Sequence, residues 1–421
     1  MSQSNREIRP LQTEAEWDAY TTISINAYPG IRATDEAARR RFKERGQEMN
    51  TDPIITVYGL FEAGEMRGSM RLYDFTMRLH GTDLLVGGLG GVGVDLLHKK
   101  ERIAYDLVQW FQRHYQQKGA AMTVLYPFRP DFYKQMGYGY GRKLNQYHIP
   151  PASLPNGNRQ NVTFLDASHQ QAFNDCYERV RQASNGLMIQ PESTVKALFS
   201  PDSTLKKVGY WADGQLQGYL LFSFEPVPNG NFLRNNIVIR TLLYENSAAL
   251  RGLLAFLRAQ ADQIEAVVLN TQDEDFHLLL HDPRNGSHNL MPGIYHESNV
   301  QGLGMMYRVI DVPRLFDLLA GHNFGGQTVT VQLNLRDSFW PECAGAWVLV
   351  AENGRITLNP AAKPDVEIGL DVAEFSSLLI GATTFRQLLA YGLADISDPA
   401  YTDAVQQMFY TPNKPICHTA F

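Results

Sequence analysis

The sequence has few of the features that mark secreted or nucleic-acid-binding proteins. It contains three cysteines in 421 residues, and none of them has the CxxC spacing of a zinc or redox motif. A disulfide framework is therefore excluded, and we expect a cytoplasmic location. Aspartate and glutamate (44) outnumber lysine and arginine (38), so the formal net charge is −6. Because there is also no run of four basic residues, we expect no nucleic-acid partner.

Long apolar runs are also absent. No stretch approaches the roughly 18 consecutive apolar residues that a membrane-spanning helix needs. The first ten residues, MSQSNREIRP, contain no hydrophobic signal segment, so we expect no membrane partner. The hydrophobic fraction of 44% and the charged fraction of 19% are ordinary for a globular protein. A chain of this length is expected to form about two to four domains.

Breaks in the sequence divide the chain into three blocks. The first block, 1–150, ends at two prolines that precede a Pro-Asn-Gly-Asn turn. The second block, 151–300, ends after a polar stretch that contains glycine. The third block covers 301–421. We therefore predict three domains.

The first two blocks contain the same order of elements. Each has two strand-like runs joined at a glycine turn, and Gly64 and Gly68 match Gly214 and Gly218 at a constant offset of 150 residues. An amphipathic helix and an apolar strand follow in each block: Arg102–His114 and Met122–Tyr126, then Ala248–Gln260 and Ala266–Asn270. This order predicts a tandem duplication of one α/β unit.

The third block has a different pattern, in which strands precede helices. The predicted strands are Gln327–Leu335, Trp347–Ala351 and Arg355–Leu358, the last two joined by an Asn353-Gly354 turn. The predicted helices are Ala373–Leu379 and Phe385–Tyr391. The pattern indicates an α+β domain.

A basic loop lies between a strand and a helix in the first block. Val86–Val94 is a glycine-interrupted strand, and Lys99 and Lys100 follow it just before the helix. The unpaired N–H groups and the dipole at a helix N-terminus favour phosphate, so this arrangement could bind an anion. The alternative from spacing alone is an ordinary solvated lysine pair.

Two other motifs are weaker. Gly88, Gly90 and Gly93 form a literal GxGxxG, which would suggest a nicotinamide-dependent oxidoreductase, but these glycines lie within a strand instead of at a strand–turn–helix junction. His277 and His281 have a helical spacing that could suggest a metal site, but no HExxH is present. We expect no metal.

The stretch FYKQMGYG at 132–139 makes a family resemblance specific. The order of strand, basic loop, helix, strand and FYKQMGYG resembles motifs A and B of the Gcn5-related N-acetyltransferase (GNAT) superfamily. The chain length, the duplicated unit and the tail PICHTAF resemble the enhanced intracellular survival (Eis) family. In the third block, Asp365–Gly381 and Leu388–Ile396 resemble a sterol-carrier-protein-like domain.

The resemblance implies a fold and an activity. The fold would be α/β (α+β), with two tandem GNAT-type domains, the second degenerate, followed by a sterol-carrier-protein-like α+β domain. The activity would be acetyl-CoA-dependent N-acetyl transfer to a primary amine of a small molecule or a lysine-like substrate. Acetyl-CoA would be the co-substrate, without a metal. Homo-oligomers, hexameric in some members, are also implied.

The resemblance assigns roles to individual residues. Val92, Gly93 and Val94 would pair with the pantetheine arm, and the Val94 N–H would polarise the thioester carbonyl. The pyrophosphate loop and helix start would be Lys99, Lys100, Glu101, Arg102, Ile103 and Ala104. Phe128 and Arg129 fall where members make further acetyl-CoA contacts. Tyr133 matches the general acid, and the α-carboxylate of Phe421 matches the general base.

The sequence departs from the signature at two positions. Leu96 stands where the signature has proline, and Arg102 stands where it has glycine. The Arg102 side chain would either contact phosphate or obstruct its approach to the backbone. These departures leave open an alternative function, a non-catalytic binding protein that holds a hydrophobic ligand in the sterol-carrier-like domain. The second block lacks the basic loop, so we expect it to bind no coenzyme A.

Overall fold

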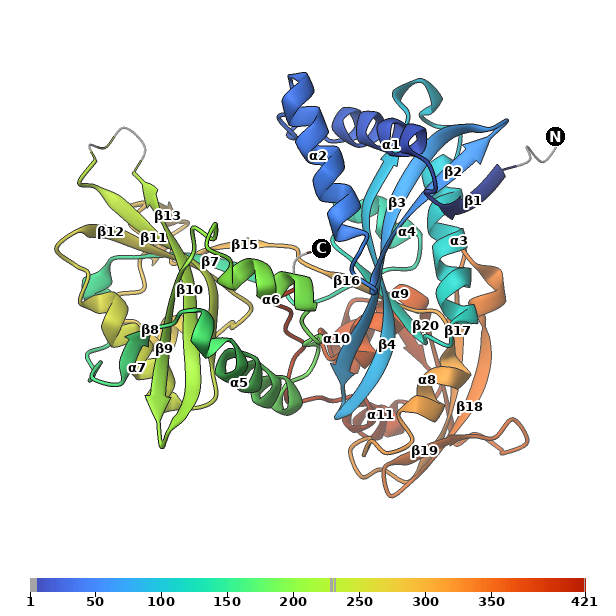
Figure 1. The fold of residues 1–421 in the computed structure, drawn as a ribbon. Helices are drawn as coiled ribbons and strands as arrows, with labels where there is room; N and C mark the ends of the chain where they lie inside the picture. Colours follow the sequence, from blue (N-terminus) through green and yellow to red (C-terminus); the bar gives the residue numbers. More distant parts are fainter. Residues whose placement is uncertain (1–5, 228–229, 231, 420) are drawn as a thin grey trace. The chain divides into compact units, whose positions relative to one another are not determined.

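The computed structural model describes residues 6–227, 230, 232–419 and 421 (Figure 1). The chain forms two compact units that interleave along the sequence. The first unit contains the chain up to Gly141 together with Asn185–Ser193 and Met305–Phe421. The second contains Arg142–Ser184 and Thr194–Gly304. The three-block division at 150 and 300 stays a prediction.

The first unit contains a seven-stranded sheet in the order β1-β2-β3-β4-β5-β16-β6. Its strands are β1 Arg6–Pro10, β2 Ile55–Glu62, β3 Glu65–Leu79, β4 Thr82–Val94, β5 Met122–Leu125, β6 Gly139–Tyr140 and β16 Met306–Val309. Strands β4 and β5 are parallel, and the other neighbouring pairs are antiparallel. All four residues of β16 are buried, which explains why this late segment lies inside the sheet, between β5 and β6.

Helices cover both faces of this sheet. They are α1 Glu14–Ala27, α2 Glu36–Met49, α3 Ile103–Gln117 and α4 Pro130–Gln135. Neighbouring residues of β2 point to opposite sides: Phe61 packs with Trp17 and Tyr20 of α1, whereas Leu60 packs with Leu107 of α3. This alternation follows from the two-residue period of a strand.

The first unit also contains a five-stranded sheet in the order β19-β18-β17-β20-β21. Its strands are β17 Val329–Arg336, β18 Gly345–Glu352, β19 Arg355–Leu358, β20 Val366–Asp371 and β21 Ala394–Ile396, and its helices are α8 Val312–Leu318, α9 Val372–Leu379, α10 Phe385–Ala390 and α11 Thr402–Met408. The α+β prediction is confirmed. Phe75 and Met77 of β3 share one hydrophobic core with Leu333 and Phe375. The two sheets of this unit are therefore packed into one body.

The second unit repeats the first sheet. Its order is β15-β7-β12-β11-β10-β9-β8. The strands are β7 Leu144–Ile149, β8 Val162–Phe164, β9 Lys206–Ala212, β10 Gln215–Pro226, β11 Asn235–Tyr244, β12 Ile264–Thr271 and β15 Val300–Gly302. The helices are α5 Gln170–Ala183, α6 Glu192–Phe199 and α7 Ser247–Arg258, and a separate hairpin is formed by β13 Leu290–Met291 and β14 Tyr295–His296.

The matched glycines have matched structural roles. Gly64 and Gly214 supply the positive φ, 81° and 72°, that each hairpin turn needs. Gly68 and Gly218 let the following helix pack closely, since a Cβ there would lie 2.7 Å from Ile103 Cγ2 and 3.1 Å from Ala249 Cβ. The predicted duplication is confirmed, and its glycines are explained by turn geometry and helix packing.

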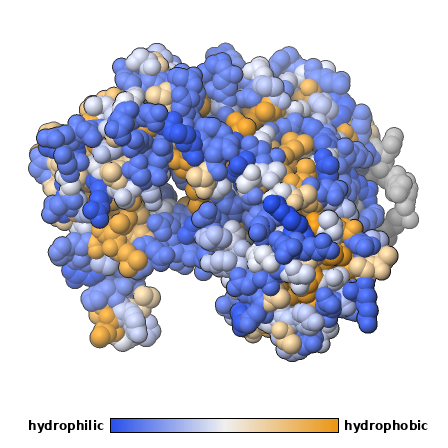
Figure 2. All heavy atoms as spheres, turned by 90° about the horizontal axis from the view of Figure 1, so that it is seen from below, coloured by the Kyte–Doolittle hydropathy of each residue, from blue (hydrophilic) through white to orange (hydrophobic). Residues whose placement is uncertain are grey.

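The face in Figure 2 is mostly hydrophilic, with separate hydrophobic patches between the hydrophilic residues. None of the helices formed by the described residues has both the length and the apolar character that crossing a membrane requires.

Candidate functional site

A bulge interrupts strand β4. Gly91 has a positive φ of 57°, and the register between β3 and β4 shifts between Ser69 and Arg71. The parallel pairing of β4 with β5 ends at Leu89 and Leu125, before the bulge. Among the residues that the structure describes, no strand covers this edge in the C-terminal half of β4, so the edge is available to a ligand.

Backbone groups on this edge are set by the strand period. The Asp95 N–H donates to the Arg67 carbonyl (2.9 Å), so the backbone of Asp95 faces β3. Successive residues alternate, so the Val94 N–H faces away from β3. The Val92 carbonyl faces the same way and accepts a hydrogen bond from the Tyr28 hydroxyl (2.9 Å). Gly93 is buried instead against α1, where a Cβ would lie 3.1 Å from Ile23 Cγ2.

The basic loop leads into an uncapped helix. Lys100 and Arg102 both adopt left-handed conformations, with φ of 69° and 64°. Arg102 is the N-cap of α3, and its side chain makes no capping hydrogen bond. In the part of the chain that the structure describes, neither Lys99 nor Lys100 forms an ion pair. Free N–H groups, the helix dipole and unpaired cations together favour an anion.

The side chains of Arg102 and Glu101 are both turned toward protein partners. The Arg102 guanidinium lies 4.2 Å from the centre of the Tyr105 ring, a cation–π contact. The Glu101 carboxylate contacts His98 Nδ1 (3.0 Å), and its carbonyl accepts from Arg6 (3.0 Å). Glu101 therefore stabilises the loop through contacts with His98 and Arg6, outside the cavity described below.

A cavity of about 660 Å³ connects these features. This volume is typical of a small-molecule site. Ten of the residues that the sequence assigned to the site line it: Val92, Val94, Lys99, Lys100, Arg102, Ile103, Ala104, Phe128, Arg129 and Tyr133. Gly93 and Glu101 do not. Sequence reasoning missed four lining residues, Ala27, Tyr28, Tyr105 and Phe132. No local motif marks the first three, whereas Phe132 opens the FYKQMGYG motif, which is the signal that could have found it.

Tyr133 lies on the short helix α4, which begins with Pro130 at a position where the missing N–H is harmless. The side chain is only 3% exposed and touches the rings of Phe128, Phe132 and Tyr138. Burial raises the pKa of the Tyr133 phenol above its ordinary value. The phenol therefore keeps its proton at neutral pH and can act as a hydrogen-bond donor.

The C-terminal tail places its last residue, Phe421, against strands β3 and β4. Its ring packs against Tyr73, Phe75 and Tyr126 at centroid distances of 5.2, 4.8 and 5.2 Å. Its carboxyl carbon lies 3.4 Å from the position that a Cβ on Gly90 would take. Gly90 precedes the cavity-lining Val92 by two residues. Phe421 itself does not line the cavity.

Hydrogen bonds hold the tail in this position. The Ile416 N–H donates to the Asn185 carbonyl (2.9 Å), and the Asn185 side chain donates to the Asn413 carbonyl (3.1 Å). Closer to the end, the Tyr126 hydroxyl donates to the Thr419 carbonyl (3.2 Å). The position of Phe421 is therefore set by both main-chain and side-chain contacts.

The corresponding helix of the second unit has a side-chain cap. The side chain of Asn246 caps α7 and accepts from the Ala249 N–H (3.0 Å). Only Arg251 supplies a cation in the segment that corresponds to the basic loop. The anion-binding features of the first unit are therefore not repeated.

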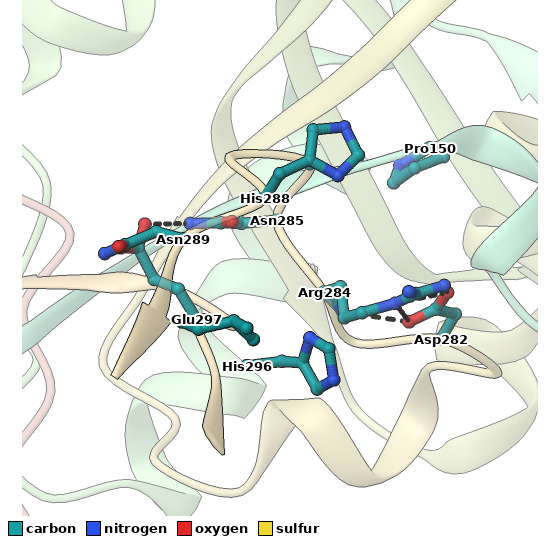
Figure 3. Close-up of a pocket in the computed structure, with 10 residues that line it drawn as sticks. Pro150, Asp282, Arg284, Asn285, His288, Asn289, His296 and Glu297 are labelled. Carbon is teal, nitrogen blue, oxygen red and sulfur yellow. Dashed lines mark hydrogen bonds and ion pairs between the residues drawn. The ribbon is translucent and has the colours of Figure 1, made fainter. Parts of the chain in front are cut away.

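The second unit contains a different cavity, of about 340 Å³, beside the β13–β14 hairpin (Figure 3). Its charged groups pair with their neighbours: Asp282 with Arg284, and Glu297 with Asn285 and Asn289. No group of three or more His, Cys, Asp or Glu residues suited to a metal is found among the described residues.

Domain families match along the chain in the order that the fold suggests. Acetyltransferase (GNAT) domains match residues 7–141 and 192–309, and a sterol carrier protein domain matches residues 315–418. No curated protein matches the chain.

Solved structures with a similar fold cover nearly the whole chain. A GCN5-related N-acetyltransferase from Anabaena variabilis ATCC 29413 is 16% identical, with a TM-score of 0.80, over 99% of this chain and 100% of that chain. A probable N-acyltransferase from Enterococcus faecalis V583 is 16% identical, with a TM-score of 0.78 and the same coverage of 99% and 100%. Eis1 from Mycobacterium abscessus is 20% identical, with a TM-score of 0.75, again over 99% and 100%.

Identities this low show the fold alone, but the domain matches over residues 7–141, 192–309 and 315–418 agree with this fold. The chain therefore belongs to the Gcn5-related N-acetyltransferase superfamily and has the Eis-like architecture of two GNAT acetyltransferase domains followed by a sterol carrier protein domain.

Proposed function

We propose that the protein transfers the acetyl group of acetyl-CoA to a primary amine of a small molecule or a lysine-like substrate, through a ternary complex. The observation that supports this most directly is the single cavity of about 660 Å³ that combines an uncovered strand edge, an uncapped helix start with basic residues, and a buried phenol. Acetyl transfer from coenzyme A needs a place for a thioester, a pyrophosphate and a proton donor, and these three features supply them.

The cofactor lies along the cavity in this proposal. Its pyrophosphate binds at the start of α3, where the N–H groups, Lys99 and Lys100 provide positive charge. Its pantetheine arm pairs with the free edge of β4, at Val92 and Val94. Phe128 and Arg129 contact the cofactor at the other wall of the cavity. The N–H of Val94 then donates to the thioester carbonyl and stabilises the negative charge that develops there.

In this proposal one group accepts the proton of the amine and another donates a hydrogen bond to the leaving group. A primary ammonium has a pKa of about 10, so it must lose a proton before it attacks the thioester. The terminal carboxylate of Phe421 accepts this proton, directly or through water. The phenol of Tyr133 donates a hydrogen bond to the departing sulfur, whose negative charge it stabilises.

The test begins with the cofactor because it needs no knowledge of the amine. Purified protein is titrated with acetyl-CoA by calorimetry, with NADH as the comparison. Saturable micromolar binding of acetyl-CoA, and none of NADH, is expected. Release of the coenzyme A thiol is then measured with lysine amide, spermidine and kanamycin as acceptors. Absence of acetyl-CoA binding would overturn the proposal and favour a binding protein for a hydrophobic ligand.

Assembly and location remain predictions. A homo-oligomer is expected from the family resemblance, and sedimentation of the purified protein measures it. A cytoplasmic location is expected from the three unpaired cysteines.

A further inference from the structure

The helix that carries Tyr133 is held from behind by a buried arginine. Arg308 of β16 donates a hydrogen bond to the carbonyl of Met136, the residue that ends α4. The next residue, Gly137, has a φ of 79°, and a Cβ there would lie 1.5 Å from the Arg308 guanidinium. Any side chain at Gly137 would therefore displace Arg308. This contact explains the first glycine of the FYKQMGYG motif.

Arg308 is fixed in turn by an aspartate of the sterol carrier protein domain. Asp337, just after β17, forms an ion pair with Arg308, and the two side chains are 1% and 0% exposed. The Asp337 carboxylate also accepts from the N–H groups of Phe339 (3.0 Å) and Trp340 (2.9 Å). The carboxylate thus links Arg308 to the loop formed by residues 337–340.

The same loop supports the cofactor side of the cavity. The ring of Phe339 lies 4.5 Å from the ring of Tyr105, and the Tyr105 hydroxyl donates to the Phe339 carbonyl (3.3 Å). Tyr105 in turn holds the Arg102 guanidinium, and both residues line the cavity. Phe339 and Trp340 belong to the same hydrophobic core as Tyr133.

We propose that loop 337–340 of the sterol carrier protein domain positions the acetyl-transfer site. Asp337, through Arg308, fixes the helix that carries Tyr133, and Phe339, through Tyr105, supports the wall near Arg102. A helix of six residues is too short to be stable alone, so its position depends on such contacts. These are positioning residues, since none touches a reacting atom, and the proposal rests on the proposed role of Tyr133.

The test measures kcat and acetyl-CoA affinity separately. Asp337→Asn removes the charge that holds Arg308 and should lower kcat at least about tenfold, because small misplacements of a catalytic group are costly. The Kd for acetyl-CoA should change less than about twofold. The matched control is Glu342→Gln, which removes an exposed ion pair between the same domain and Arg113 of α3. The control should leave kcat unchanged. A kcat of Asp337→Asn close to that of the parent protein would overturn the proposal.

A double-mutant cycle separates positioning from a general loss of structure. In a Tyr133→Phe background, Asp337→Asn should have little further effect on kcat, because the group that it positions is already gone. An equal reduction of kcat in both backgrounds would overturn the proposal. If Tyr133→Phe alone leaves kcat unchanged, the assigned role of Tyr133 fails instead, so the two failures are distinguishable.

A second variant covers the case in which Asp337→Asn does not fold. Removing one partner leaves a buried charge alone, whereas replacing both by apolar residues of similar volume is often tolerated. The paired variant Arg308→Met with Asp337→Asn removes both charges and the bond to Met136, and the asparagine oxygen can still accept from the N–H groups of Phe339 and Trp340. It should show the same loss of kcat while circular dichroism remains that of the parent. A folded paired variant with full kcat would also overturn the proposal.

Discussion

Arg102 stands where the GNAT signature has glycine, and it adopts the left-handed conformation that glycine prefers, with a φ of 64°. A side chain in this conformation costs about 1–2 kcal/mol. The contact of its guanidinium with the Tyr105 ring offsets part of this cost. At the scale of the residue, the departure from the signature therefore keeps the backbone shape of the loop and directs the added side chain onto a neighbouring ring.

The backbone cost can be isolated by comparing two variants that both lose this ring contact. Arg102→Ala retains a Cβ in the left-handed conformation, whereas Arg102→Gly does not. We expect the alanine variant to be less stable than the glycine variant by about 1 kcal/mol. Urea denaturation of both proteins measures the difference. Equal stabilities would show that the loop adopts another conformation in the variants.

Tyr133→Phe should lower kcat by about 10- to 100-fold, since it removes the hydrogen bond to the departing sulfur. The Kd for acetyl-CoA should stay within about twofold, because the aromatic packing is retained. Burial raises the pKa of Tyr133, so the wild-type kcat should show no alkaline decline from this group below about pH 10. Steady-state rates between pH 6 and pH 10 provide the check, and an unchanged kcat in the variant would leave Tyr133 with a packing role only.

His322 gives the stability of the protein a dependence on pH. Its ring stacks on His80 (4.4 Å), and burial, with smaller effects of His80 and Arg355, lowers its pKa to about 4. In the unfolded chain the pKa is about 6.5, so the unfolded state binds the proton first as the pH falls. The contribution of His322 to stability should therefore be constant above about pH 6.5 and decrease between pH 6.5 and 4, by roughly 2 kcal/mol.

Replacement of the histidine tests this assignment. His322→Phe should reduce the loss of unfolding free energy between pH 7 and pH 4.5, measured by urea denaturation. The exposed His277 provides the matched control, and His277→Gln should leave the loss unchanged. An identical pH dependence in the wild type and His322→Phe would contradict the assignment.

At the scale of elements, the C-terminal tail is held in the first unit by contacts with residues far from it in the sequence. It contacts Asn185 and Tyr126, which lie far from it in the sequence, and it ends with an aromatic cluster around Phe421. The carboxyl carbon of Phe421 lies beside Gly90 of β4. Because a glycine there has no Cβ, the tail can approach the strand closely. The position of the carboxylate therefore depends on this close contact.

Extension of the tail tests whether this carboxylate takes part in the reaction. Adding three glycines after Phe421 converts the carboxylate into an amide and should reduce turnover to near background. Acetyl-CoA affinity should be nearly unchanged, since the described residues of the tail do not line the cavity of about 660 Å³. Calorimetry and the thiol-release assay measure the two quantities. Full turnover in the extended protein would remove the carboxylate from the mechanism.

At the scale of the whole molecule, two related GNAT domains differ in the start of one helix. In α3 the first-turn N–H groups lack a side-chain cap and lie beside Lys99 and Lys100, whereas in α7 the side chain of Asn246 occupies this position. A capped helix start has less capacity to bind phosphate, because the cap already accepts a hydrogen bond from one of the N–H groups. The duplicated fold therefore does not repeat the uncapped helix start with its neighbouring lysines.

One acetyl-CoA per chain is the expected stoichiometry. Lys99→Glu combined with Lys100→Glu should abolish detectable binding, because it reverses the charge of the only site that we propose. Calorimetry measures both the stoichiometry and the loss. Two equivalents per chain, or residual binding of one equivalent in the double variant, would place a cofactor in the second GNAT domain.

The sequence alone determined the local elements. Glycine turns, the two-residue period of the strands and the amphipathic helices predicted the duplicated unit. The family resemblance carried by the basic loop and FYKQMGYG assigned roles to ten residues that line the cavity. Helix α3 was predicted to begin at Arg102 and begins one residue later. These features depend on interactions within a few residues, which is why the local pattern contains them.

Only the tertiary structure decided how distant segments meet. It inserted β16 between β5 and β6, placed Tyr28 against Val92, and brought Arg308 to Met136, 172 positions earlier in the chain. It also brought the end of the tail to Gly90. No local pattern marks these pairs, because the contacts arise from the shared burial of segments whose own sequences would fit several partners. Long-range packing therefore completed a site whose separate parts were local.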